Sequence, residues 1–168
     1  MSLSISIKMT LPKDGVFRNK RWLDTISSRQ RVHTVPQMRS LFSKTVFGWS
    51  DKPHFGWTQT KSQDSIGITM YPTGPAAETW NLVSLGSPEH RIAPKNGGFL
   101  RFRYGYRAAT RPGSIMSQRA YRSGPYKSYE SVWHLGFKPR NFPDLIADAY
   151  RRDFEDEMQF AFNEAAKS

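Results

Sequence analysis

The chain is organised around one stretch, which reads WNLVSLGS (80–87), HRIAPK (90–95), LRFRY (100–104), VWHLGF (132–137) and PRNF (139–142). The LRFRY segment alternates apolar and basic side chains, the pattern of a strand. The residues before the stretch predict a helical lead-in over 19–49, and those after it predict one amphipathic helix over 142–166. For residues 80–85 the pattern does not distinguish a short helix from a strand.

The composition indicates one folded domain. The chain has 168 residues, of which 38% are hydrophobic and 14% aromatic, enough for one core but not for two independent ones. The absence of cysteine excludes disulfides and thiolate metal sites. No apolar run approaches the roughly 18 residues of a membrane helix, and the first residues lack a signal-peptide core. We therefore expect a single soluble domain over residues 1–168.

The net charge of +11 is unevenly distributed. Residues 1–143 contain 22 Lys and Arg against 7 Asp and Glu, whereas residues 144–168 contain 3 against 7. The first part therefore carries a charge of +15 and the second −4. Such an excess of one sign is typical of a surface that faces a polyanion or an acidic partner, although a solvated basic surface gives the same count.

The N-terminal part predicts one strand and a helical region. Residues 4–8 alternate polar and apolar side chains, as a short strand does. From Asn19 the apolar spacing becomes helical. Pro36 is expected to interrupt a continuous helix, and Thr34 with Gln37 three residues later resembles a capping box that starts a second helix. The lead-in is therefore either two helices or one kinked helix.

Four further strands are expected between residues 57 and 134. Segments 57–60 and 65–71 predict a hairpin that turns near residues 63–64. In the strand at 99–104, Leu100 and Phe102 face the core, and Arg101 and Arg103 point away from it. Segment 131–134 is expected to pair with 99–104 as the second half of a long hairpin.

Residues 105–131 form a long connection without clear periodicity. Connections of this length in a compact domain are uncommon and often functional. This one is basic and rich in tyrosine, so we expect a projecting loop that becomes ordered when it binds a neighbour.

The C-terminal segment predicts the most regular helix of the chain. Pro143 suits its first turn, and Asp144 is favourably placed for the helix dipole. Apolar side chains follow at four-residue spacing: Ile146, Tyr150, Phe154 and Met158. The fold class predicted is α+β, a small antiparallel sheet with a long hairpin insert, packed against an N-terminal kinked helix and a C-terminal amphipathic helix.

The sequence predicts no catalytic centre, metal site or cofactor. The four histidines show no metal-ligand spacing. His90 and His134 are expected to approach each other and to fix turns through hydrogen bonds to the backbone. The acidic side chains of the last helix fit a solvated face better than a paired-carboxylate site, although they could also dock on a basic neighbour. We therefore expect no enzymatic activity.

The basic insert with its tyrosines also resembles a surface for single-stranded nucleic acid. It lacks the sequence motifs of the common specific readers. A stand-alone, non-specific nucleic-acid-binding protein is therefore the alternative function.

The order of the short motifs resembles that of the neck and tail-completion proteins that join heads to tails in long-tailed bacteriophages (siphophages). The resemblance covers about residues 40–165. Ser87 stands where that family usually has Thr, and Leu135 replaces the Pro of a His-Pro-Gly motif. The matching residues are Trp80, Gly86, His90, Ile92, Pro94, Lys95, Leu100, Phe102, Val132, His134, Gly136, Arg140 and Phe142.

The resemblance implies a non-enzymatic structural protein of the virion neck, assembled in the host cytoplasm. Its partners would be copies of itself in a ring, most simply six-fold, and the adjacent head-closure, tail-terminator or tail-tube proteins. Non-specific contact with the genomic DNA is left open. We expect the C-terminal helix to contact the next subunit through Asp153, Asp156 and Glu157. We expect partner or DNA-channel contacts from Arg101, Arg103, Arg107, Arg111, Arg119, Arg122 and Lys127.

Overall fold

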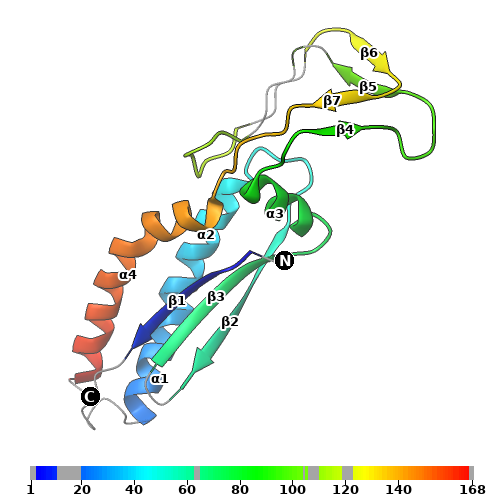
Figure 1. Cartoon of the computed structure of the whole chain (residues 1–168). Coiled ribbons are helices and arrows are strands. Elements are labelled where there is room, and N and C mark those ends of the chain that lie inside the picture. The colour runs from blue at the N-terminus through cyan, green and yellow to red at the C-terminus, as the bar shows by residue number, and fades with distance from the viewer. Residues whose placement is uncertain are drawn as a thin grey trace.

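The computed structural model of the chain shows an α+β body from which a β-ribbon arm extends (Figure 1). It describes residues 3–10, 20–62, 65–103, 105, 110–118 and 123–166. The elements in chain order are β1 (Ile5–Thr10), α1 (Lys20–Arg29), η2 (Gln30–Thr34, a π-helix), α2 (Val35–Thr45), β2 (His54–Lys61), β3 (Ser65–Thr73), α3 (Ala77–Leu85), β4 (His90–Ile92), β5 (Leu100–Arg103), β6 (Tyr126–Tyr129), β7 (Val132–His134) and α4 (Phe142–Ala166).

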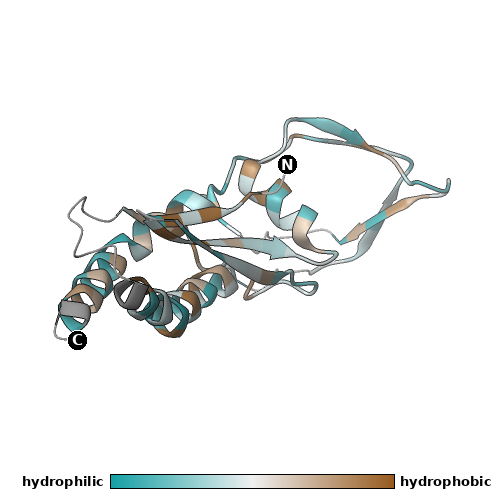
Figure 2. Cartoon of the chain, turned by 90° about the horizontal axis from the view of Figure 1, so that it is seen from below, coloured by the Kyte–Doolittle hydropathy of each residue, from teal (hydrophilic) through white to brown (hydrophobic). Residues whose placement is uncertain are grey.

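The body contains a three-stranded antiparallel sheet in the order β1-β3-β2. The β2–β3 hairpin and the strand near the N-terminus confirm the sequence prediction, and Ile68 of β3 pairs with Ile7 on one side and Gln59 on the other. Ile66, Ile68 and Met70 are fully buried. Since alternate residues of a strand share a face, these three side chains form the face that meets the helices. Figure 2 shows α1, α2 and α4 gathered on one side of this sheet.

The lead-in is one bent helix, in which α1 runs through η2 into α2. The predicted capping box at Thr34 is wrong, because Thr34 has helical dihedral angles and its side chain caps no backbone N–H. It is fully buried and donates instead to Glu157 Oε2 at 3.2 Å. The π-helical turn lies directly before Pro36, where an α-helix would need the backbone donor that proline lacks. The bend therefore accommodates Pro36 without ending the helix.

The C-terminal helix α4 begins at Phe142, as predicted, and packs against α1, η2 and α2. Ile146, Tyr150 and Met158 are buried, and Phe154 packs against both apolar clusters of the body. Burial of each such side chain contributes about 1.5–3 kcal/mol to stability.

Residues 80–85, which the sequence pattern assigned to neither a helix nor a strand, belong to helix α3. Its Trp80 is fully buried and donates from Nε1 to Thr45 Oγ1 at 2.9 Å. The indole ring stacks on Phe42 with centroids 5.6 Å apart, and the Phe142 ring lies 5.5 Å away. Trp80 therefore fixes the point from which the chain enters the arm, between α2 and the start of α4.

The predicted long hairpin is wrong in its pairing. Strand β5 pairs with β6, and β7 pairs with β4, so the arm consists of two separate two-stranded ribbons. Neither ribbon covers the core, and Phe102, expected to face it, is exposed. The expected projecting loop at 105–131 is also wrong in part. It contains β6, and Ser117 within it is buried and donates its backbone N–H to the Lys44 carbonyl of the body at 3.0 Å.

Candidate interaction arm

The arm, residues 86–140, leaves the body after α3 and returns before α4 (Figure 1). It contains 11 Lys and Arg against 2 Glu, a net charge of +9, whereas the rest of the chain contains 14 against 12, a net charge of +2. The positive charge thus belongs to the arm and not to the whole of residues 1–143. An interaction with an acidic partner is expected there.

The root of the arm is held by a backbone bridge between Ser87 and Phe137. Each donates its N–H to the carbonyl of the other, at 3.1 and 3.0 Å. Gly86 and Gly136 flank the bridge with φ of 79° and 74°. A Cβ atom at Gly86 would lie 2.7 Å from the Pro139 nitrogen, and one at Gly136 would meet the backbone of Ser87 and Pro88. Only glycine fits both the dihedral angles and the space.

The returning chain closes the C-terminal end of α3. The backbone N–H groups of Arg140 and Asn141 donate to the Ser84 carbonyl at 3.1 and 3.0 Å, and the Phe142 N–H donates to Ser84 Oγ. These bonds satisfy helix-end groups that would otherwise lack partners. The buried Arg140 guanidinium donates to Thr110 Oγ1 and the Lys138 carbonyl, and burial lowers the pKa of Arg140 from its ordinary value. Arg140 is thus a structural residue of the root.

His90 and His134 face each other across β4 and β7, with ring centroids 5.1 Å apart. His90 Nδ1 lies 2.9 Å from the Pro88 carbonyl, and His134 Nδ1 accepts the Gly136 N–H at 3.0 Å. Both imidazoles therefore brace turns at the root through backbone hydrogen bonds, as the sequence predicts.

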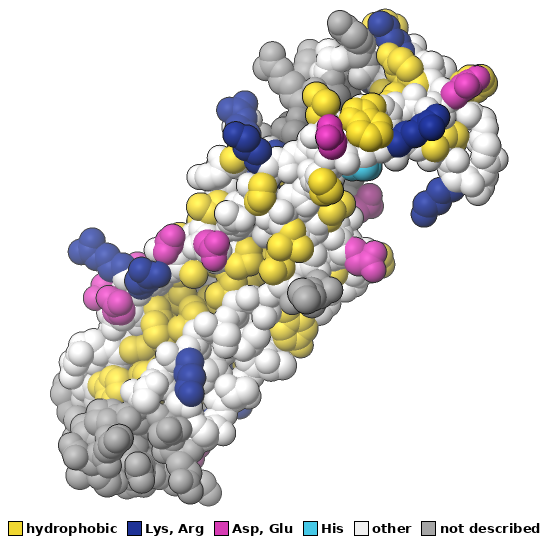
Figure 3. All heavy atoms as spheres, in the orientation of Figure 1, with side chains coloured by type: hydrophobic (Ala, Val, Ile, Leu, Met, Phe, Trp, Pro, Cys, Tyr) yellow, Lys and Arg dark blue, Asp and Glu magenta, His cyan; other side chains and the backbone are white. Residues whose placement is uncertain are grey.

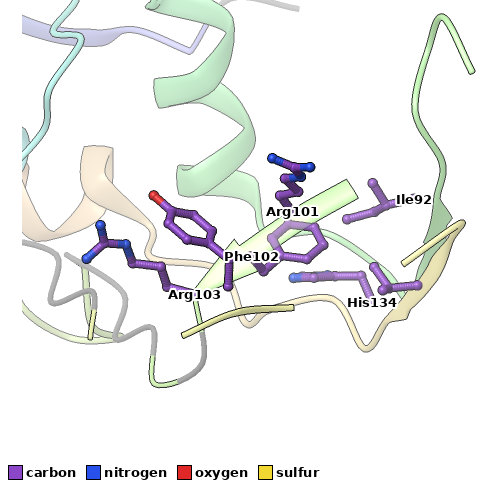
Figure 4. A pocket seen from close by; sticks show the side chains of 7 residues that line it. Ile92, Arg101, Phe102, Arg103 and His134 are labelled. Atoms are coloured by element: carbon purple, nitrogen blue, oxygen red, sulfur yellow. The ribbon is translucent and has the colours of Figure 1, made fainter. Parts of the chain in front are cut away.

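A groove of about 780 Å³ lies between the two ribbons. Figure 4 shows the Phe102 ring on the His134 side of β5, while the guanidinium groups of Arg101 and Arg103 extend away from His134. The Arg103 guanidinium lies over the Tyr126 ring, 4.8 Å from its centroid. The groove thus combines cations with aromatic and aliphatic walls; its lining residues are Ile92, Arg101, Phe102, Arg103, Tyr126, Val132 and His134.

Large apolar side chains of the arm are exposed to solvent. The exposed fractions are 64% for Phe99, 62% for Tyr126, 62% for Trp133 and 83% for Leu135. The Trp133 side chain makes a hydrogen bond, in which Nε1 donates to Glu89 Oε2 at 3.3 Å. Clusters of exposed apolar surface usually mark interaction sites. Leu135 is the most exposed of these side chains.

The other residues predicted for the arm are spread along it. Lys127 lies on β6 opposite Phe102, and Lys95 is exposed next to Pro94 in the turn between β4 and β5. Arg111 is exposed in segment 110–118, which lies against the body. The predicted sites at 107, 119 and 122 lie outside the described residues.

The acidic residues of α4 fall into two groups. Asp153 and Asp156 are exposed, whereas Glu157 is engaged within the monomer. Its carboxylate accepts hydrogen bonds from Thr34, Gln37 and Tyr150 at 3.2, 2.7 and 2.9 Å. Burial, together with the negative charge of Glu157, raises the pKa of Tyr150 above its ordinary value. Of the three residues expected to contact a neighbour, Asp153 and Asp156 are thus the accessible ones.

Two side-chain contacts of the structure were not predicted from the sequence. Ser117 accepts the Gly48 N–H at 2.9 Å and donates from Oγ to the Lys44 carbonyl, and no pattern marks a serine inside an aperiodic connection. The Tyr150–Glu157 contact could have been found, because residues seven apart share a helix face.

Within the described part of the chain, no three His, Asp or Glu side chains are arranged to hold a metal ion. Over the same residues, none of the helices has the length and apolar character of a membrane span. Comparisons of the chain with protein-family models, with curated proteins and with solved structures gave no significant match.

Proposed function

We propose that this chain is a structural protein of a phage neck, which joins the tail to the DNA-filled head as one subunit of a ring. The observation that carries the proposal is the arm: a rigidly rooted projection that holds +9 of the net charge of +11 and exposes large apolar side chains. These are the properties of a surface made for a macromolecular partner.

The residues that resemble the phage family support the proposal through their positions. Trp80 lies in the core below the arm, Gly86, Gly136 and Arg140 build its root, and His90 and His134 brace its turns. The shared pattern therefore corresponds to the construction of the arm.

Electron microscopy of a lysate from a phage that lacks this gene tests the proposal. We expect full heads and separate tails, and joined particles when the gene is supplied from a plasmid. Normal joined particles in the absence of the gene would overturn the proposal. Empty heads or missing tails would also overturn it, because they would place the defect in another step.

The arm also favours a second candidate, a stand-alone protein that binds nucleic acid without reading sequence. Arg103 stacked on Tyr126 and the neighbouring Arg101 supply the cations and ring that such surfaces use. In this case the isolated protein would shift DNA of any sequence in a gel, and binding would fall steeply with added salt. Absence of a shift at low salt would exclude this candidate.

A further inference from the structure

We propose that the arm of one copy binds the exposed acidic face of α4 in the next copy, so that subunits associate head to tail. This inference deepens the proposed function by naming a second copy of this chain as the partner of the arm. It rests on two surfaces of opposite charge at different ends of one elongated molecule.

The first surface is the part of the arm around the groove, whose lining includes Arg101 and Arg103 of β5 with their guanidinium groups extending away from His134 (Figure 4). The second is the outer face of α4, on which Asp144, Asp148, Asp153, Glu155 and Asp156 are exposed and which also carries Arg151 and Arg152. Residues 144–168 have a net charge of −4, against +9 for the arm. Complementary surfaces of this kind select a partner and fix its orientation.

Most of these charges form no ion pair within the part of the chain that the structure describes, although the Arg103 guanidinium lies over the Tyr126 ring. Among the described residues, Asp148 pairs with Arg151 and Glu164 with Arg29, but no ion pair engages Asp153, Glu155 or Asp156. The same holds for Arg101 and Arg103 in the described part of the arm. The groups that would meet in the contact are thus those that the monomer leaves exposed.

The acidic face also offers an apolar group. Phe160 lies four residues after Asp156 on α4. It is 47% exposed, although the Arg29 guanidinium of the same chain lies over its ring, 4.3 Å from the centroid. The groove provides Phe102, Tyr126 and Val132 for such a ring. A contact with an apolar centre and charged margins matches the usual anatomy of a protein interface.

In the monomer, the C-terminal half of α4 lies away from the arm (Figure 1). The arm lies at one end of the molecule, and α4 runs from the arm's root toward the opposite end (Figure 1). Figure 3 shows Lys and Arg side chains projecting from the arm, while along the body Lys and Arg lie beside Asp and Glu. A contact between two different patches is heterologous, and such contacts produce rings when the rotation closes.

Charge reversal in the full-length protein tests the contact. The arm variant carries Arg101→Glu and Arg103→Glu, the helix variant Asp153→Lys and Asp156→Lys, and a quadruple variant combines all four. A matched control reverses the exposed body residues Lys8 and Arg39 to Glu. Sedimentation velocity at low and high salt measures self-association, and circular dichroism verifies folding.

We expect the arm and helix variants each to weaken self-association at least tenfold, and the quadruple variant to regain most of it. The control should behave as wild type, and high salt should weaken wild-type association. Failure of the quadruple variant to regain association would overturn the inference. So would association of the arm variant at wild-type strength, or a wild type that stays monomeric at low salt.

Cysteine pairs give a second, independent readout, because the chain has no cysteine of its own. A tagged Arg103→Cys chain is mixed with an untagged Asp156→Cys chain and oxidised, and Arg39→Cys replaces Arg103→Cys in the control. We expect the mixed disulfide only for the first pair, and equal yields would overturn the inference. If this link is absent while heads and tails still require the gene to join, the inference fails and the proposed function stands.

Discussion

At the residue scale, the root glycines differ from the glycines of the arm's turns. Gly136 has a positive φ and no room for a Cβ, whereas Gly97 has a similar φ of 71° and open space around it. At position 136, both packing and backbone conformation require glycine. At position 97, backbone conformation alone favours it.

We therefore predict that Gly136→Ala destabilises the root more than Gly97→Ala does. Each substitution costs about 1–2 kcal/mol, because it places a residue with a side chain in the left-handed conformation. Only Gly136→Ala also displaces the backbone of Ser87 and Pro88. Hydrogen exchange at the amides of Ser87 and Phe137 should be faster in Gly136→Ala. Equal exchange rates in the two variants would contradict this account of the root.

The buried contact between Tyr150 and Glu157 makes stability depend on pH. The pKa of Tyr150 is raised in the folded protein, so above the ordinary tyrosine value of about 10 the unfolded chain ionises first. The unfolded state then binds fewer protons than the folded state, and the free energy of unfolding falls as pH rises.

We predict that Tyr150→Phe removes this part of the pH dependence. The variant should lose about 1 kcal/mol at pH 7, where the hydrogen bond to Glu157 is missing, and should lose less stability than wild type between pH 10 and 11. Urea unfolding at pH 7, 10 and 11 measures both effects. Parallel losses in the two proteins would show that Tyr150 is not the group responsible.

The sequence was informative about residues whose roles are local. The bracing roles of His90 and His134 follow from short turns around each residue, and the i+4 ladder of α4 follows from helix periodicity. Thr34 was misassigned because a capping box is a local pattern, while its actual partner, Glu157, lies on another helix. A tertiary contact therefore determines the role of Thr34.

At the scale of elements, segment 110–118 is held on the body by Ser117. The Ser117 hydroxyl joins Gly48, just beyond α2, to Lys44 in the last turn of α2, and the Ser117 side chain is buried. The segment therefore ties the middle of the arm sequence to the end of the bent helix.

We predict that Ser117→Ala loosens this segment. The partly buried Gly48 N–H loses its acceptor, at a cost of about 1 kcal/mol for one hydrogen bond. Ser114→Ala is the matched control, since the Ser114 hydroxyl contacts only the nearby Met116 carbonyl among the bonds of the described residues. Hydrogen exchange over 110–118 should increase in the first variant alone, and protection unchanged from wild type would refute the role of Ser117.

The body's elements could be predicted because burial imposes their pattern, as in β3 and α4. The pairing of the ribbons could not, because β5 and β6 are exposed in the structure, and the apolar–basic alternation of β5 does not correspond to a buried face. Where neither face is buried, the register of a strand is weakly specified. The sequence therefore located strand β5 but gave it the wrong partner.

At the scale of the whole molecule, the main finding is where the positive charge lies. Division of the sequence at residue 143 gives a basic body and an acidic tail, but the fold gathers +9 in the arm and leaves the remainder near neutral. Basic residues distant in sequence meet there because β4–β7 and β5–β6 bring both ends of the arm together. Only the topology could show this.

The most direct test of the proposed role of the arm is electron microscopy of phage that lack this gene and are complemented with variants. The fraction of full heads that carry a tail is counted for wild type, for Arg101→Glu with Arg103→Glu, and for the control Lys8→Glu with Arg39→Glu. We predict joined particles with wild type and control, and separate heads and tails with the arm variant at equal expression and melting temperature. Joined particles at wild-type frequency with the arm variant would contradict the account.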